Sequence, residues 1–119
     1  MRLRLALTAV LSSALTLLVV YGLGGAPLPR KITLENAKVK VTEMTYLPGV
    51  PRDRHIRPHD QVIVFLDDCS YERTDSQTGE KTVRRRRSGD VIWHHKGEDA
   101  PQLINLGTKP YRTIVVELK

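Results

Sequence analysis

The stretch PGVPRDRHIRPHDQVIVFLDD, residues 48 to 68, decides the fold because it joins a Pro-Gly turn, a polar segment and an apolar strand. Five successive apolar residues, Val62 to Leu66, indicate a β-strand that is covered on both faces. Alternate side chains of a strand point to opposite faces, so Val62, Val64 and Leu66 share one face. We expect Val64 to lie in the core.

The rest of the chain after residue 26 alternates short strand patterns with turn signals. Gly79 marks a hairpin between residues 74 and 81, and the SGD motif at residues 88 to 90 marks a further turn. We expect strands over residues 37–47, 61–68, 69–74, 91–95, 101–106 and 111–119, with a further one after Gly79. Roughly seven or eight short strands without helical periodicity predict a small all-β, antiparallel sandwich or barrel.

Residues 1 to 26 have the pattern of an export signal. Arg2 and Arg4 precede an apolar run from Leu5 to Leu23 that holds no charged side chain. This predicts a secretory signal peptide or, if it is not cleaved, an N-terminal membrane anchor, which would be the only membrane contact. Both alternatives place the folded part outside the cytoplasm, in the periplasm or secreted. We expect a linker over residues 27–36 and one domain over residues 37–119.

The chain is basic, with a formal net charge of +6. Two of these charges belong to the leader, and the clearest cluster in the domain is Arg84–Arg87. We interpret this run as a solvated edge strand that its charge protects from aggregation, with a site for an anion or an acidic partner as the alternative. An exported protein meets little nucleic acid, so none is expected as a partner.

The chain contains one cysteine, Cys69. A lone cysteine excludes an internal disulfide, and its place after an apolar strand predicts a small buried residue. A disulfide to another chain is the alternative.

The order of these signals resembles the two sequence motifs of the cupin superfamily, whose fold is a small jelly-roll barrel. The first motif corresponds to residues 48–68, and the second to SGDVIWHHKGEDAPQLINLGTKP, residues 88–110. The matching positions are Pro48, Gly49, Gly89, Asp90, Trp93, Gly97, Asn105 and Gly107. The resemblance implies an antiparallel jelly-roll barrel over most of the domain, but not a function, because this fold serves many activities.

The metal ligands of the family do not carry over. The family's first histidine matches His55, but its second histidine matches Arg57, its glutamate matches Gln61 and its last histidine matches Pro101. A guanidinium stays protonated and only donates hydrogen bonds, so Arg57 cannot bind a cation. We therefore expect no metal cofactor. The weaker alternative is a divalent transition metal in a rebuilt site formed by His55, His59 and one of His94 or His95.

The residues that replace the ligands suggest a pocket for an anion. Arg57 offers a planar fork of donors, His55 a neutral acceptor or base, and Gln61 both a donor and an acceptor. Trp93 offers an apolar or stacking wall. Alternatively, Arg57 points outward and pairs with Asp53 or Asp60.

Three functions remain open. The first is a metal-independent binding module for a small anionic or sugar-like molecule. The second is a small enzyme that uses His55 as acid or base, or a rebuilt metal site. The third is a structural barrel that forms a homodimer and binds no ligand. No nucleophile–base pair, glycine-rich phosphate loop or carboxylate pair indicates a particular reaction.

Overall fold

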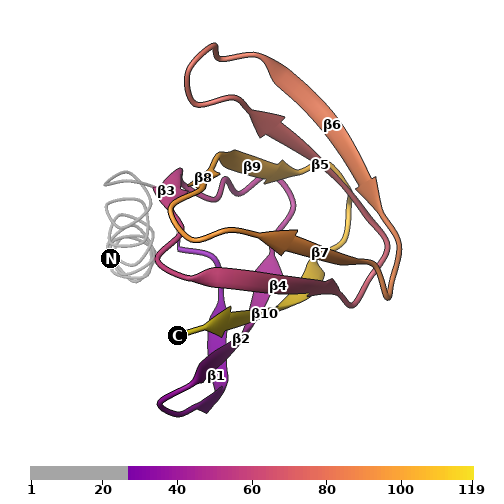
Figure 1. The fold of residues 1–119 in the computed structure, drawn as a ribbon. Coiled ribbons are helices and arrows are strands. Elements are labelled where there is room, and N and C mark those ends of the chain that lie inside the picture. Colours follow the sequence, from indigo (N-terminus) through magenta and orange to yellow (C-terminus); the bar gives the residue numbers. More distant parts are fainter. Residues whose placement is uncertain (1–26) are drawn as a thin grey trace, which may run out of the picture.

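The computed structural model describes residues 27 to 119, which form ten β-strands and no helix (Figure 1). The strands are β1 Arg30–Glu35, β2 Val39–Tyr46, β3 His55–Ile56, β4 Asp60–Phe65, β5 Cys69–Thr74, β6 Lys81–Arg86, β7 Val91–His94, β8 Asp99–Ala100, β9 Gln102–Asn105 and β10 Tyr111–Leu118. They make a five-stranded sheet β1-β2-β10-β4-β7, a three-stranded sheet β6-β5-β9 and a short pair β3-β8. All strand pairs are antiparallel, so the expected all-β, antiparallel fold is confirmed.

The core lies between the two larger sheets and is rich in aromatic rings. Tyr46 and Tyr111 stack with their ring centres 4.7 Å apart, and Tyr71 lies 6.2 Å from both Tyr111 and Phe65. Such rings bury large apolar areas and hold the two sheets together. The buried cluster consists of Leu28, Met44, Tyr46, Ile63, Phe65, Tyr71, Leu103 and Tyr111.

Strand β4 faces the core with a different set of residues from the one we expected. Ile63 and Phe65 are 8% and 4% exposed, whereas Val62, Val64 and Leu66 are only partly buried. The expectation that Val64 lies in the core is therefore wrong, and so is the expectation of a strand covered on both faces. An apolar run offers two apolar faces, so the run alone does not tell which face is inside.

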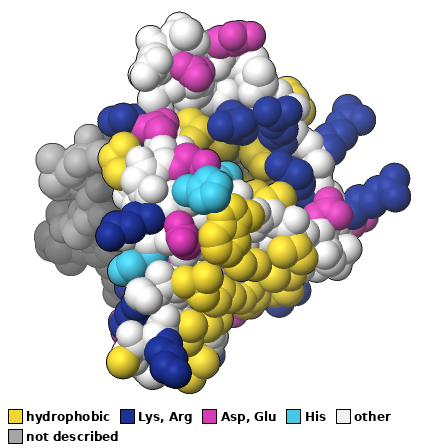
Figure 2. Space-filling model, viewed as in Figure 1, with side chains coloured by type: hydrophobic (Ala, Val, Ile, Leu, Met, Phe, Trp, Pro, Cys, Tyr) yellow, Lys and Arg dark blue, Asp and Glu magenta, His cyan; other side chains and the backbone are white. Residues whose placement is uncertain are grey.

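The outer face of the five-stranded sheet carries exposed apolar side chains. Val91 is 60% exposed and Trp93 46% exposed, and they lie opposite Val64 and Val62 in the strand register. Figure 2 shows the hydrophobic side chains as one continuous area in the lower half of this view. The apolar character of β4 and β7 thus serves both the core and the outer surface.

Strand β1 lies inside the segment that we expected to be a linker. Arg30–Glu35 pairs with β2, from Arg30 opposite Met44 to Glu35 opposite Lys40, and all six of its residues are exposed. Leu28, just before it, is buried in the core. The linker expectation is corrected here: the sheet begins at Arg30 and not at residue 37. Backbone hydrogen bonds to β2 hold this strand in place. Its side chains are not buried on either face, so no buried face could be predicted from the sequence.

The predicted hairpin at Gly79 joins β5 to β6. The φ angle of Gly79 is 73°, in the left-handed region that glycine adopts without a steric penalty. The Asp75 carboxylate accepts hydrogen bonds from the backbone N–H groups of Gln77 and Thr78, at 2.9 and 2.8 Å. This turn places β6 as the outermost strand of its sheet, where the arginine run lies.

Cys69 begins β5 and is half-buried against the core. Burial raises the pKa of its thiol to about 11, so the thiol stays protonated and unreactive at neutral pH.

Between residues 27 and 119, no helix is long and apolar enough to cross a membrane. The leader expected over residues 1 to 26 lies outside the described residues.

Candidate functional site

A cavity of about 80 Å³ lies inside the barrel, between the two larger sheets. We call it the inner cavity. Strands from both sheets contribute to its wall, which combines aromatic and aliphatic side chains with basic ones. The lining residues are Tyr46, Arg52, Arg57, Ile63, Phe65, Tyr71, Arg73, Arg86, Ile92, His94, Pro101, Leu103, Tyr111 and Thr113.

The charged side chains of this wall are all basic. Four arginines and one histidine line the inner cavity, and no aspartate or glutamate does. A carboxylate just outside the wall, that of Glu98, lies 3.6 Å from Nε of Arg57 and also contacts Nδ1 of His94. Charges of one sign in a partly enclosed, low-dielectric space produce a strong positive potential. The inner cavity is therefore suited to an anion.

Arg57 lies deepest among these arginines, with 5% of its surface exposed. It follows β3, and its backbone is fixed by two hydrogen bonds, from its N–H to the Glu98 carbonyl and from the Gly97 N–H to its own carbonyl. Nη1 donates to Oε1 of Gln61 at 2.9 Å, whereas Nε has no acceptor within hydrogen-bond distance. Burial, with the nearby charge of Arg52, lowers the pKa of Arg57. A bound anion would oppose both effects, because a negative charge nearby favours the charged guanidinium.

Arg52 reaches the inner cavity from the loop between β2 and β3. Its backbone is bonded in both directions to Leu103 of β9, at 2.8 and 3.2 Å. One end of its guanidinium contacts the Pro101 carbonyl, and the other donates to the Tyr46 hydroxyl at 3.5 Å. Its buried Nε has no acceptor. The sequence did not indicate Arg52 as a site residue, because its loop position shows no strand periodicity.

Two further arginines come from the β5–β6 hairpin, Arg73 and Arg86. Nε of Arg86 donates to the Tyr71 hydroxyl at 3.3 Å, and its guanidinium carbon lies 5.7 Å from the ring centre of Phe65. Arg86 lies opposite Cys69 in the register and belongs to the run Arg84–Arg87. The interpretation of this run as a purely solvated strand is therefore incomplete, because one of its members lines the inner cavity.

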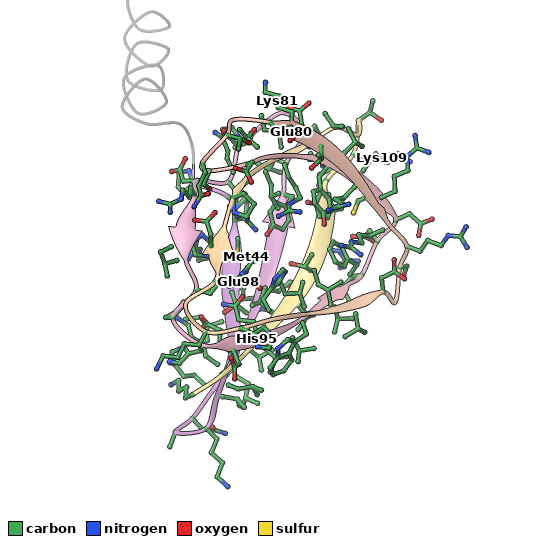
Figure 3. The ribbon with its side chains drawn as sticks, turned by 45° about the horizontal axis from the view of Figure 1, so that its top comes forward. Met44, Glu80, Lys81, His95, Glu98 and Lys109 are labelled. Atoms are coloured by element: carbon green, nitrogen blue, oxygen red, sulfur yellow. The ribbon has the colours of Figure 1, made fainter. Side chains whose placement is uncertain are left out.

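Thr113 and His94 complete the polar part of the wall. Thr113 is 2% exposed, and its hydroxyl has no hydrogen-bond partner within residues 27 to 119. His94 contacts the Glu98 carboxylate through Nδ1, which leaves Nε2 as its other ring nitrogen. Burial, and then the charge of Arg57, lower the pKa of His94. Glu98 is held at the turn after β7, where its N–H donates to the His95 carbonyl at 3.1 Å (Figure 3).

The structure brings together three of the four residues that we expected in the ligand pocket. His55, Arg57 and Gln61 line a wider groove of about 670 Å³ at the β1–β2 side of the barrel. Tyr46, Arg52, Arg57 and Ile63 line both the groove and the inner cavity, so they form the wall between the two. Arg57 points inward and contacts Gln61, so the alternative in which it pairs with Asp53 or Asp60 is wrong.

Trp93 lies away from the groove, and His55 lines the groove without being buried in it. His55 is exposed, and its Nδ1 lies 3.4 Å from the Asp53 carbonyl. Trp93 is not a wall of the groove or of the inner cavity, and its indole N–H donates to Nδ1 of His95 at 3.1 Å. Its neighbours Ile92 and His94 point inward instead. In a strand, this alternation sends Trp93 outward.

The residues do not fit a metal centre. Among residues 27 to 119, no three His, Cys, Asp or Glu side chains lie close enough together to hold an ion, so the set of His55, His59 and His94 is not assembled. Nδ1 of His59 lies 3.9 Å from the Glu117 carboxylate. The Arg57 guanidinium stands at the position where the resemblance places a second ligand. Its fixed positive charge would repel a cation.

Comparison of the structure with solved structures identifies its fold. It is similar to a cupin domain from Bordetella pertussis, with a TM-score of 0.70 and 20% sequence identity over 77% of this chain and 93% of that one. The chain has the cupin fold. A double-stranded β-helix protein from Klebsiella pneumoniae has a TM-score of 0.61, with 20% identity over 78% and 77% of the two chains. The predicted jelly-roll barrel is thereby confirmed.

Two similar structures are of proteins with a stated activity. The polyketide cyclase RemF from Streptomyces resistomycificus has a TM-score of 0.61, with 16% identity over 76% of this chain and 64% of that one. The DMSP lyase DddQ from Ruegeria pomeroyi has a TM-score of 0.58, with 14% identity over 77% and 47%. No protein-family model and no curated protein matches the sequence. At these identities the likeness extends to the fold and not to an activity.

Proposed function

We propose that this chain is a small cupin-fold module that binds an anion inside its barrel without a metal ion. The observation that carries this proposal is a set of buried polar atoms without a hydrogen-bond partner, Nε of Arg52, Nε of Arg57 and Oγ1 of Thr113, which all belong to residues of the inner cavity. Of these, Nε of Arg57 has only the 3.6 Å ion pair with Glu98. A buried polar atom without a partner is destabilising by roughly 1–3 kcal/mol, so folded proteins rarely keep several around one cavity. An anionic oxygen would accept hydrogen bonds from all three groups.

The size of the inner cavity limits what it holds. A volume of about 80 Å³ is roughly half that of a ~150 Å³ cavity that binds benzene. A carboxylate or a comparable small oxyanion fits this space better than a sugar ring does. The sugar-like part of a ligand would therefore lie outside the inner cavity.

The test is ligand-dependent stabilisation of the full chain. Formate, acetate and inorganic phosphate are added at constant ionic strength, with chloride as the reference, and thermal unfolding is recorded. A ligand at about 100 times its Kd is expected to add ~2.7 kcal/mol of stability. Arg57→Gln and Arg52→Gln should lose this gain. Arg112→Gln, the control, removes an exposed arginine that pairs with Asp67 and should keep it.

Two outcomes would contradict the proposal. One is equal stabilisation by chloride and by the oxyanions in the parent protein. The other is a gain that survives in both cavity variants. Either outcome leaves the barrel without a specific anion site, and sedimentation of the parent would then test the alternative of a homodimer that binds no ligand.

We also propose that the module works outside the cytoplasm. Support comes from the sequence of residues 1 to 26, where Arg2 and Arg4 precede an uncharged apolar run. A reporter that is active only after export, fused behind Lys119, should be active, and its activity should disappear when residues 1 to 26 are deleted. A soluble, full-length cytoplasmic protein would overturn this proposal.

An enzyme is the second function that the geometry favours, but with His94 and not His55 as the proton-transfer group. His94 lines the inner cavity and its Nδ1 contacts Glu98, which orients the ring and leaves Nε2 as a base. Such a base beside an anion site suits proton abstraction next to the carbonyl group of a small keto acid, whose carboxylate the site would hold. Exchange of the methyl protons of pyruvate for deuterium, followed by NMR, would show it. Exchange in the parent that is lost in His94→Gln would support an enzyme, and equal rates would reject it.

A further inference from the structure

A second hollow adjoins the inner cavity on the β5–β6 hairpin. We call it the outer hollow. It is open, with a volume of about 690 Å³, and its lining residues are Arg73, Val83, Arg84, Arg85 and Arg86. Arg73 and Arg86 also line the inner cavity, so the two spaces meet at these side chains. Figure 2 shows Lys and Arg side chains gathered in the upper right of this face, over the hairpin.

The register of β5 and β6 turns two arginines of the run toward the barrel. Arg84 lies opposite Tyr71 and Arg86 opposite Cys69, and directly opposite residues of an antiparallel pair share a face. Tyr71 is buried in the core, so this shared face turns toward the barrel. Arg86 is partly buried there, whereas Arg84 stays exposed. If the charge of this strand served only to prevent aggregation at the sheet edge, no arginine would have to face the barrel.

These arginines carry charge that nothing else in the described structure neutralises. Among residues 27 to 119, none of Arg73, Arg84, Arg85 and Arg86 forms an ion pair with a carboxylate. Like charges on neighbouring positions repel one another, which destabilises the hairpin unless a partner of opposite charge is present. Arg84 and Arg86 stand two residues apart, or ~7 Å along the strand. The row therefore presents positive groups at regular intervals leading to the inner cavity.

We propose that the ligand is an elongated oligoanion with a carboxylate or phosphate on each unit. Its terminal anionic group enters the inner cavity between Arg52 and Arg57. The next groups lie against Arg73 and Arg86 at the junction, and later ones against Arg84 and Arg85 in the outer hollow. This inference rests on the proposed anion site and extends it from a single group to a chain of groups.

An anionic membrane surface explains the arrangement less well. A flat lipid surface contacts side chains that project outward, whereas Arg86 is partly buried and bonded to Tyr71, and Arg73 lines the inner cavity. A chain molecule with one free end can follow the row inward, which a surface cannot do. Vesicle binding is therefore the alternative outcome of the test.

The test measures the dependence of affinity on ligand length, by calorimetry on the full chain. Two series serve as probes: galacturonate from the monomer to the tetramer, and phosphate from the monomer to linear tetraphosphate. The readout is the ratio of the Kd of the monomer to that of the tetramer, at constant ionic strength. In the parent this ratio should exceed about tenfold in at least one series, a gain of ~1.4 kcal/mol. The series with the larger ratio identifies the anionic group.

The decisive variant is Arg84→Gln with Arg85→Gln, whose ratio should fall to near one. Its control is Lys31→Gln with Lys38→Gln, which removes the same charge from exposed positions at the β1–β2 hairpin, at the other end of the molecule (Figure 1). The control should keep the parent ratio. If the double arginine variant does not fold, Arg84→Gln alone should still lower the ratio.

Every other outcome contradicts either the oligoanion inference or the anion site on which it rests. A ratio near one in the parent, with a monomer that binds, rejects the oligoanion and keeps the anion site. A monomer that does not bind counts against the anion site itself. An equal fall of the ratio in the lysine control shows unspecific attraction. Binding to vesicles with anionic lipid, without any gain from soluble oligomers, shows that the arginine row contacts a membrane.

Discussion

Arg57 donates a 2.9 Å hydrogen bond from Nη1 to Oε1 of Gln61 inside the barrel. Gln61 makes a second hydrogen bond, in which its Nε2 donates to the Glu117 carboxylate at 3.3 Å. The resemblance to the cupin motifs places metal ligands at both positions, and here a fixed cation and a neutral amide interact with each other instead. The same part of the barrel has become a site with positive charge and hydrogen-bond donors.

Returning metal ligands to these positions should create metal binding. Arg57→His with Gln61→Glu, together with His55, would restore three of the four groups that the resemblance implies. We expect this variant to retain about one zinc or nickel ion by elemental analysis and to melt higher when the metal is added. The parent should show neither effect. Arg112→His with Gln102→Glu is the matched control, and stoichiometric transition metal bound through His55 in the unmodified protein would overturn the prediction.

Ile63 should contribute more to stability than its neighbour Val64. Ile63 is 8% exposed in the core, whereas Val64 lies on the half-buried outer face. Ile63→Ala leaves a cavity and should lower the free energy of unfolding by about 2–5 kcal/mol, and Val64→Ala by about 1 kcal/mol or less. Urea unfolding of both variants measures the difference. A larger loss for Val64→Ala would show that the faces of β4 are assigned the wrong way round.

Thr113→Val should stabilise the protein without ligand and weaken anion binding. Valine has nearly the shape of threonine but lacks the buried hydroxyl, whose lack of a partner is destabilising by roughly 1 kcal/mol or more. The melting temperature without ligand should therefore rise, and the gain on adding acetate or phosphate should shrink. Thr45→Val, on the outer face of β2, is the control. If the variant is less stable and binds anions as the parent does, the hydroxyl has no part in the site.

Anion binding should be coupled to proton uptake by His94. Burial and the positive charges of Arg57 and Arg52 hold its pKa below 6.5, against the opposing effect of Glu98. The unfolded state therefore binds the proton more tightly, so the stability from neutral His94 is complete above about pH 6.5 and falls as the pH decreases below it. A bound anion raises this pKa again. Affinity should thus increase as the pH falls toward about 6.

Calorimetry in two buffers of different ionisation enthalpy measures this coupling. In the parent, the apparent binding enthalpy should differ between the buffers, and in His94→Gln it should not. Equal enthalpies for the parent in both buffers would show that no proton is taken up.

The fold could be predicted from the sequence because its signals are local. The apolar run of β4, the turn at Gly79 and the order of the two motifs each depend on neighbouring residues. Strand β1 was missed because its alternation is short, with Ile32 and Leu34 between polar residues, and because its pairing with β2 is a tertiary contact. The choice of the inner face of β4 is also tertiary, since both faces of the run are apolar.

The site could be predicted only in its chemistry. The replacement of metal ligands by Arg57 and Gln61 indicated an anion, and these two side chains do meet. Arg52, Arg73 and Arg86 come from a loop and from the far sheet, and only the closed barrel brings them to Arg57. Trp93 matched a motif position, but strand alternation turns it outward. A motif identifies residue types in order, whereas a cavity depends on which faces of distant strands meet.

The outward position of Trp93 determines what the intrinsic fluorescence of this protein reports. It is the single tryptophan of the chain, and its indole hydrogen bond to His95 lies on the outer face. Three of the four tyrosines, in contrast, stand in the wall of the inner cavity. Indole fluorescence will therefore report the hydration of the outer sheet and the contact with His95, and it should not change when the inner cavity is filled. Ultraviolet difference absorption is the optical signal that will change when the inner cavity is filled, because the phenol rings of Tyr46, Tyr71 and Tyr111 line it.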